Sequence, residues 1–207
     1  MASSFFKDNM KRITTLIAIC LAGCISAFAQ PRALGTRVGA MGFELSYQHD
    51  MGKKSFIQTD LGLDFGYSSS STPGIKATVL YNFIIARPAW TDRGSWSLHA
   101  GPGISLGSVF DRIHYGNVGE FHPIQSGDYG FMLALAVQAG LEYTFWFPLQ
   151  IAVDIRPYFG MHANGKIIGI KTDSNSMVTM RYLKGKTGYY DHGWLGFIPA
   201  LSVRYRF

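Results

Sequence analysis

The chain has 207 residues, about the length of one domain, and its 19 basic and 13 acidic residues give a formal net charge of +6 at pH 7. So small a basic excess does not favour nucleic acid as a partner. After residue 30, no apolar run is long enough to cross a bilayer as a helix. If the chain lies in a membrane, a closed β-barrel is the architecture that remains, because backbone polar groups cannot face lipid unpaired.

The first 29 residues have the features of a secretory signal peptide. A basic start is followed by an apolar run at residues 13–22 and by Ala27-Phe28-Ala29, which fits a small-x-small cleavage site. Cleavage after Ala29 would remove both Cys20 and Cys24. The chain from residue 30 onward would then contain no disulfide and no thiolate metal site.

Two other interpretations of the N-terminal segment stay open. Leu21-Ala22-Gly23-Cys24 resembles a lipobox, and processing there would leave a lipid-modified Cys24. A lipid anchor would be redundant on a protein already embedded in a membrane. The other interpretation is a buried N-terminal helix, against which the basic start and the cleavage pattern speak.

Between residues 30 and 207, segments in which apolar and polar residues alternate are separated by segments rich in turn residues. Alternation with a period of two gives a strand one apolar and one polar face. Eight such strands are predicted. The first region is divided into two short strands, because a single strand there would give seven and bacterial barrels normally close with an even number. The eight strands span residues 33–39, 43–49, 55–67, 75–87, 95–107, 129–146, 149–161 and 194–207.

The connections between these strands alternate in length. Residues 50–54, 88–94 and 147–148 form short turns on one side, whereas residues 68–73, 108–128 and 162–193 form longer loops on the other. Short periplasmic turns and long outer loops are typical of outer-membrane barrels. Aromatic residues flank both sets of connections, as expected at two membrane interfaces.

The last strand carries the most specific pattern. From Leu195 to Phe207, every second residue is apolar or aromatic, whereas the other face holds, apart from Trp194 and Ile198, small residues and arginines, and the chain ends on Phe207. This ending, with Tyr205 two residues before Phe207, resembles the C-terminal strand of bacterial outer-membrane barrels, which carries the signal that the insertion machinery recognises. The whole of residues 30–207 resembles the small OmpA/OmpX-like barrels in size and strand number.

The pattern and the resemblance together predict an all-β fold: an eight-stranded antiparallel up-and-down transmembrane β-barrel at residues 30–207, preceded by a signal peptide at residues 1–29. We expect a monomer in the outer membrane of a Gram-negative bacterium, with membrane lipids and the barrel-insertion machinery as partners. No periplasmic domain follows Phe207 in this sequence, which argues against an OmpA-like tether to peptidoglycan.

Charged residues are predicted on the inward faces of the strands. A lumen of eight strands is just wide enough to be filled by side chains, so these charges should pair and plug it. A gated proton or ion path through the same residues is the alternative. The predicted inward set is Arg37, Glu44, Asp60, Asp64, His99, Glu142, Asp154, Arg156, Arg204 and Arg206.

An enzyme is not expected. Some eight-stranded outer-membrane barrels modify lipid A with a histidine and a serine or aspartate near the outer rim, and the outer loops here contain such residue types. They show no fixed catalytic spacing, and no H-x-x-x-H or H-E-x-x-H metal motif occurs, so neither metal nor cofactor is expected. The residues in question are His114, His122, Ser126, Asp128, His162, Asp191 and His192.

The third outer loop has internal order. Residues 166–171 and 177–182 are β-prone and are joined by the turn signal Asp173-Ser174-Asn175-Ser176, which predicts a hairpin. Its basic residues suit an acidic glycan or lipid phosphates, and its strand edges suit an extended protein ligand. A solvated loop without a partner is the simpler alternative.

Overall fold

The computed structural model describes residues 32–65, 73–111, 122–123, 128–164, 166–172, 178–184 and 187–207. The expected signal peptide at residues 1–29, with its lipobox and buried-helix alternatives, lies outside these residues. The predicted end of the third strand, residues 66–67, also lies outside them.

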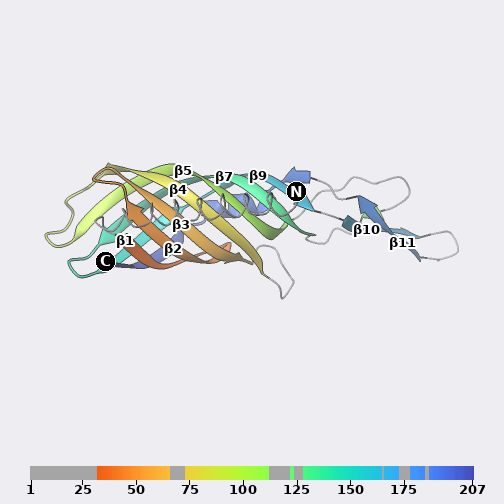
Figure 1. Ribbon diagram of the computed structural model, residues 1–207, viewed down its shortest axis with the longest axis horizontal. Helices are drawn as coiled ribbons and strands as arrows, with labels where there is room; N and C mark the ends of the chain where they lie inside the picture. Colours follow the sequence, from red (N-terminus) through yellow and green to blue (C-terminus); the bar gives the residue numbers. More distant parts are fainter. Residues whose placement is uncertain are drawn as a thin grey trace, which may run out of the picture. The chain divides into compact units, whose positions relative to one another are not determined.

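The strands form one closed antiparallel ring of eight positions. Six positions are filled by single strands, each paired with the next (Figure 1). They are β1 (Arg32–Gly39), β2 (Gly42–Asp50), β3 (Ser55–Asp64), β4 (Gly74–Ala86), β5 (Ser95–Asp111) and β7 (Asp128–Thr144).

The two remaining positions are each filled by two shorter strands. β8 (Leu149–Ile155) and β9 (Tyr158–Asn164) both pair with β7 and together make the seventh position. In the eighth, β12 (Thr187–Tyr189) pairs with β9, and β13 (Ala200–Arg206) pairs with β8. β13 also pairs with β1, which closes the ring and confirms the predicted eight-stranded barrel.

The two faces of the strands differ as the alternation predicted. Along β7, Leu133 and Leu135 are exposed on the outer surface, whereas Ala134 and Ala136 are buried inside. The same alternation holds along β3 and β4. The barrel therefore has an apolar outer surface and an interior that collects most of its buried polar groups.

The predicted strand at residues 149–161 is broken at Arg156 and Pro157. Proline has no N–H for the ladder, and here its carbonyl oxygen still accepts a hydrogen bond from Val137 N at 3.2 Å. The Arg156 N–H turns to the eighth position and donates to Gly196 O at 2.6 Å. Pro157, predicted to face outward, is buried beside that position.

The prediction of a strand at residues 194–207 was wrong for its first half. Asp191–Phe197 form a 3₁₀ helix, η1, and β13 begins only at Ala200. Pro199 cannot donate a ladder bond, and Trp194, Phe197 and Ile198 are exposed with helical rather than alternating spacing. Gly193 and Gly196 let η1 lie directly on the backbone of residues 156–158, where a Cβ atom would collide with the carbonyl oxygens of Tyr158 and Arg156.

The wall of the barrel is shorter on one side than on the other. We call the end that holds Arg32 and Phe207 the terminal rim, and the opposite end the loop rim. β1 and β2 turn back at Ala40 and Met41, and their ladder stops at Gly39 and Gly42, whereas β5 and β7 stay paired up to Asp111 and Asp128. η1 lies in the part of the wall that this short hairpin leaves incomplete.

A separate three-stranded sheet forms from residues of the two longest loops. β10 (Lys166–Thr172) and β11 (Val178–Lys184) pair as an antiparallel hairpin, as predicted, and β6 (His122–Pro123) adds to β10. Within the described part of the chain, no helix has both the length and the apolar character needed to cross a membrane.

We expect Gly196→Ala to destabilise the barrel. The new methyl group would collide with the Arg156 carbonyl oxygen, and overpacking of this kind costs roughly 1–3 kcal/mol. Gly52→Ala is the control, because its Cβ atom meets nothing within 4 Å and only the φ of +87° opposes it, at about 1 kcal/mol. The free energy of unfolding in urea measures both; a Gly196→Ala barrel as stable as the parent would contradict the packing of η1.

Candidate functional site

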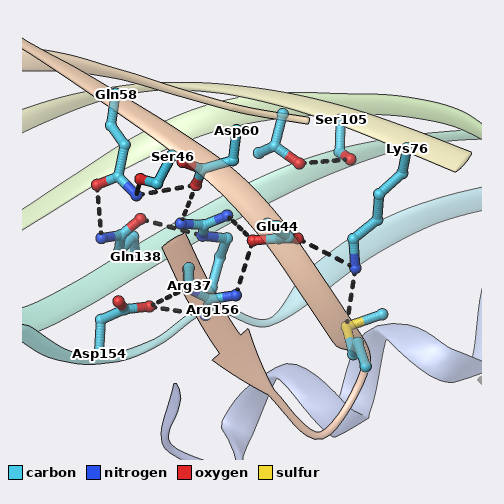
Figure 2. A network of polar contacts seen from close by, with 12 residues as sticks. Arg37, Glu44, Ser46, Gln58, Asp60, Lys76, Ser105, Gln138, Asp154 and Arg156 are labelled. Carbon is cyan, nitrogen blue, oxygen red and sulfur yellow. Dashed lines mark hydrogen bonds and ion pairs between the residues drawn. The ribbon is translucent and has the colours of Figure 1, made fainter. Parts of the chain in front are cut away.

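The interior of the barrel holds a network of charged and amide side chains, which is the candidate functional site (Figure 2). Each of these residues faces inward because it occupies an inward position of the two-residue repeat. The buried charged residues that share this interior, including both rims, are Arg37, Glu44, Asp60, Asp64, Lys76, Asp111, Glu142, Asp154, Arg156 and Arg204.

Glu44 on β2 lies at the centre of the network. Its Oε2 atom accepts hydrogen bonds from Arg37 Nη1 at 3.0 Å and from Arg156 Nη1 at 3.1 Å. Its Oε1 atom lies 3.4 Å from Lys76 Nζ. Figure 2 shows the three cations approaching Glu44 from different parts of the wall. The Glu44 side chain is only 4% exposed, so these contacts replace its hydration.

Each of the three cations also binds a second carboxylate. Arg37 donates to Asp154 Oδ1 through Nε at 3.0 Å and Nη2 at 2.7 Å. Lys76 Nζ lies 3.1 Å from Asp64 Oδ2, and Arg156 Nη2 pairs with Asp60 Oδ2. The chain of ion pairs thereby ties β1, β2, β3, β4 and β8 together across the lumen.

Glutamine side chains extend the network toward the terminal rim. Gln58 Nε2 donates to Asp60 Oδ2 at 2.8 Å, and Gln138 Nε2 donates to Gln58 Oε1 at 3.2 Å. Gln138 Oε1 accepts in turn from Arg156 Nε at 3.0 Å, and its amide nitrogen lies 3.3 Å from His99 Nε2. The two amides therefore run beside the Arg156–Asp60 ion pair and connect it to His99.

A second, looser cluster lies closer to the terminal rim. Arg204 Nε donates to Ser46 Oγ at 3.0 Å, and its Nη1 atom lies 4.0 Å from Glu142 Oε2. Ser97 Oγ donates to Glu142 Oε1 at 3.4 Å. Closer still to the terminal rim, Gln150 Nε2 donates to Gln48 Oε1 at 2.9 Å. These layers fill the lumen down to the rim.

Toward the loop rim, the interior becomes apolar. Tyr190, directly before η1, joins this layer, and its hydroxyl donates to Asp64 Oδ2 at 3.3 Å at the boundary with the polar network. The layer consists of Met41, Leu80, Val109, Met132, Ala134, Ala136, Tyr158 and Tyr190, with Leu195 of η1 packed against it.

The start of η1 caps this apolar layer. Asp191 N donates to Asp111 Oδ2 at 2.7 Å, and His192 Nδ1 lies 2.9 Å from the Phe110 carbonyl oxygen. His162 Nε2 lies 3.0 Å from the carbonyl oxygen of Val109. Both histidines are fully buried. The loop end of β5 thus holds the segment that closes the lumen.

Nine of the ten residues predicted to face inward are buried: Arg37, Glu44, Asp60, Asp64, His99, Glu142, Asp154, Arg156 and Arg204. Arg206 differs, because it ends β13 at the terminal rim, where its Nη2 atom lies 3.0 Å from Asp50 Oδ2 and its side chain is 35% exposed. Lys76 was missed as a member of the charge network. The alternation of β4 does place it inward, but its neighbours Leu80 and Ile84 make that face look apolar.

Tyr205 and Phe207 lie on the outer surface at the terminal rim, with their rings stacked and their centroids 6.4 Å apart. Their role as an insertion signal stays a prediction. Of the residues considered for catalysis, His114 and Ser126 lie outside the described residues, as do the side chains of His122 and Asp128. Within the described residues, no group of three or more histidine, cysteine or acidic side chains is placed to hold a metal ion.

No protein-family model matches the sequence, and no curated protein matches it. Among solved structures, the chain is similar to a major outer membrane protein from Thermus thermophilus, with 11% sequence identity and a TM-score of 0.38. The similarity covers 86% of this chain and 97% of the other.

We expect Glu44→Gln to destabilise the barrel far more than Asp50→Asn. The first substitution leaves three buried cations without the carboxylate on which they converge, and breaking a buried ion pair typically costs about 3–5 kcal/mol. The second removes a partly exposed pair at the terminal rim, which is worth about 0–1 kcal/mol. Urea unfolding of the refolded variants measures both; equal losses would show that Glu44 does not hold the interior together.

Proposed function

We propose that the protein is an integral β-barrel of the outer membrane of a Gram-negative bacterium, with a plugged interior and a structural or surface-interaction role. One observation supports this most strongly: the barrel exposes its apolar side chains on the outside and buries its charges inside. Soluble proteins rarely expose a continuous apolar patch of more than a few hundred Å². The exposed set includes Leu45, Leu61, Val79, Ile104, Leu135, Val153 and Leu201, which come from strands all around the ring.

Aromatic clusters at both rims support the same proposal. At the terminal rim, Trp90, Trp96 and Tyr143 form a continuous series of ring contacts, with centroids 5.4 and 4.6 Å apart. At the loop rim, Phe159 packs edge-on against Trp194 at 5.8 Å. Tryptophan and tyrosine are enriched where a bilayer meets water, so the two clusters suit the two interfaces.

We infer that the loop rim faces the outside of the cell. The terminal rim carries short turns, whereas the sheet formed by β6, β10 and β11 comes from the long connections at the loop rim. Its basic sequence suits an acidic glycan or protein as a surface ligand. The membrane lipids would be the other partner, with the barrel acting as a monomer.

The interior supports a structural rather than a transporting or catalytic role. Paired charges and amides fill the lumen, and η1 closes the apolar layer above them. His162 and His192 are buried against carbonyl oxygens of β5, as structural histidines are, rather than open to a substrate.

Membrane residence predicts two biochemical properties. The protein should stay in the membrane fraction after carbonate extraction, and the unboiled protein should migrate differently from the boiled protein on a gel, because the closed barrel resists detergent. Recovery of folded protein in the soluble periplasmic fraction would overturn the proposal.

The plug predicts that the protein reconstituted in planar bilayers shows no stepwise conductance. The side chains of the ion-pair network occupy the space that ions would need. The Glu44→Gln variant is measured beside it. This substitution loosens the centre of the ion-pair network, so it is the interior change most able to open a path for ions. Stable single-channel steps from the unmodified protein would favour the channel alternative.

A further inference from the structure

The barrel wall has a seam at its eighth position. On one side, η1 is joined to the backbone of residues 156–158, since Arg156 N donates to Gly196 O and Gly193 and Gly196 lie in direct contact with this segment. On its other side, η1 faces the turn of the β1–β2 hairpin, and among the described residues no backbone hydrogen bond joins the two. The last ladder pair of this wall is Val38 with Leu201.

A narrow slit lies at this seam, next to the polar network. Gly39, Ala40, Met41 and Gly42 line one side, and Leu195, Gly196, Ile198 and Ala200 line the other. Arg37, Glu44, Arg156 and Tyr158 lie at its inner end. The free volume is about 10 Å³, which is close to the space of one water molecule. Five of the eight wall residues are glycine or alanine, so the walls suit a thin, unbranched occupant that takes the place of the Met41 side chain.

Met41 closes the slit on its inner side. Met41 lies in the tight turn between β1 and β2, where side chains are usually exposed, yet it is only 6% exposed. Its sulfur lies 3.6 Å from Lys76 Nζ. Met132 lies in the same apolar layer. Methionine side chains are unbranched and adapt to new neighbours, so this layer can repack around an apolar chain without breaking the ladders of the wall. The turn and the pale blue helix can be followed in Figure 2.

The inner end of the slit also holds a donor with no acceptor. Tyr158 is 1% exposed, and its hydroxyl has no hydrogen-bond partner. A buried hydroxyl without a partner is unfavourable, and an acceptor brought in by a ligand would relieve it. The acceptor should be neutral, because the four carboxylates of Glu44, Asp60, Asp64 and Asp154 already outnumber the cations of Arg37, Lys76 and Arg156.

We propose that the seam is a lateral binding slot for a single-chain acyl ester that enters from the bilayer. The hydrocarbon chain lies between the hairpin turn and η1 and displaces Met41, and the ester carbonyl accepts a hydrogen bond from the Tyr158 hydroxyl. This slot rests on the proposed membrane location, because the seam must open onto lipid.

Binding can be followed through the methionine methyl groups. The full chain is labelled with ¹³C-methyl methionine, placed in nanodiscs of ether-linked phosphatidylcholine, which has no carbonyl group, and titrated with methyl dodecanoate. The resonances of Met41 and Met132 should shift and saturate. Met51 and Met161, which are exposed on the turn at the terminal rim and on the outer surface, should not. A Met41→Leu variant assigns the key resonance.

Two sets of variants test the slot itself. Tyr158→Phe should weaken binding roughly tenfold through loss of the one hydrogen bond, whereas Tyr129→Phe, at an exposed tyrosine of β7, should leave it unchanged. Gly39→Cys with Ala200→Cys can staple the base of the seam, since a Cβ atom at residue 39 would lie 2.9 Å from that of Ala200, and the two strands need to part by only about 1 Å to reach the Cβ–Cβ distance of a disulfide. In a Cys20→Ser, Cys24→Ser background, oxidation should abolish the Met41 shift and reductant should restore it.

The outcomes separate the slot from the membrane location. A Met41 resonance that ignores the ester, equal binding by Tyr158→Phe, or an equal shift in the oxidised and reduced staple would each overturn the slot. A full Met41 shift produced by ester-linked phosphatidylcholine alone would assign the seam to bilayer phospholipid and overturn the single-chain ligand. Failure of the protein to enter nanodiscs would instead overturn the membrane proposal.

Discussion

Glu44 and the three cations around it set the constraint on which the rest of the barrel depends. A ring of eight strands leaves an interior that side chains must fill, and in this chain many of those side chains are charged. Arg37, Lys76 and Arg156 are each shared between Glu44 and a second carboxylate, so no cation in this set faces the interior without a counter-charge. Arg37 with Asp154, and Arg156 with Glu44 and Asp60, join parts of the wall that lie far apart in the sequence. These pairs can form only in the closed ring, and they favour one register of closure.

The weak part of the wall lies where the chain departs from regular strands. Pro157 interrupts the seventh position and η1 replaces part of the eighth, next to a hairpin too short to reach the loop rim. Gly193 and Gly196 bind η1 to its neighbour on one side by close backbone contact. On the other side, no backbone hydrogen bond among the described residues joins η1 to the β1–β2 turn, and a small cavity lies between them. One edge of η1 therefore stabilises the wall, and the other edge is where we place the proposed slot.

Alternation along the sequence predicted nine of the ten inward residues, because a period of two assigns each residue to a face without knowledge of its partners. The count of eight strands also needed the rule that bacterial barrels close with an even number, and the β10–β11 hairpin needed the turn signal at residues 173–176. Alternation could not predict η1. Trp194 to Pro199 holds no polar residue, so alternation cannot distinguish a strand from a helix there. The contact of Gly196 with Arg156, in the break between β8 and β9, shows why a helix fits at this place. The partners of Glu44 were also beyond prediction, since they depend on which strands close the ring. Lys76 was overlooked because its apolar neighbours on the same face concealed an inward charge.

The central claim is that lipid chains cover the apolar outer surface of the barrel. The most direct measurement is the transfer of magnetisation from lipid acyl-chain protons to the methyl groups of the protein in nanodiscs. The account predicts strong transfer to Ile104, Leu135 and Val153, which are exposed outside, and none to Leu80, which is buried inside. Transfer to the outer methyl groups from water or from other protein groups, with none from acyl chains, would contradict it.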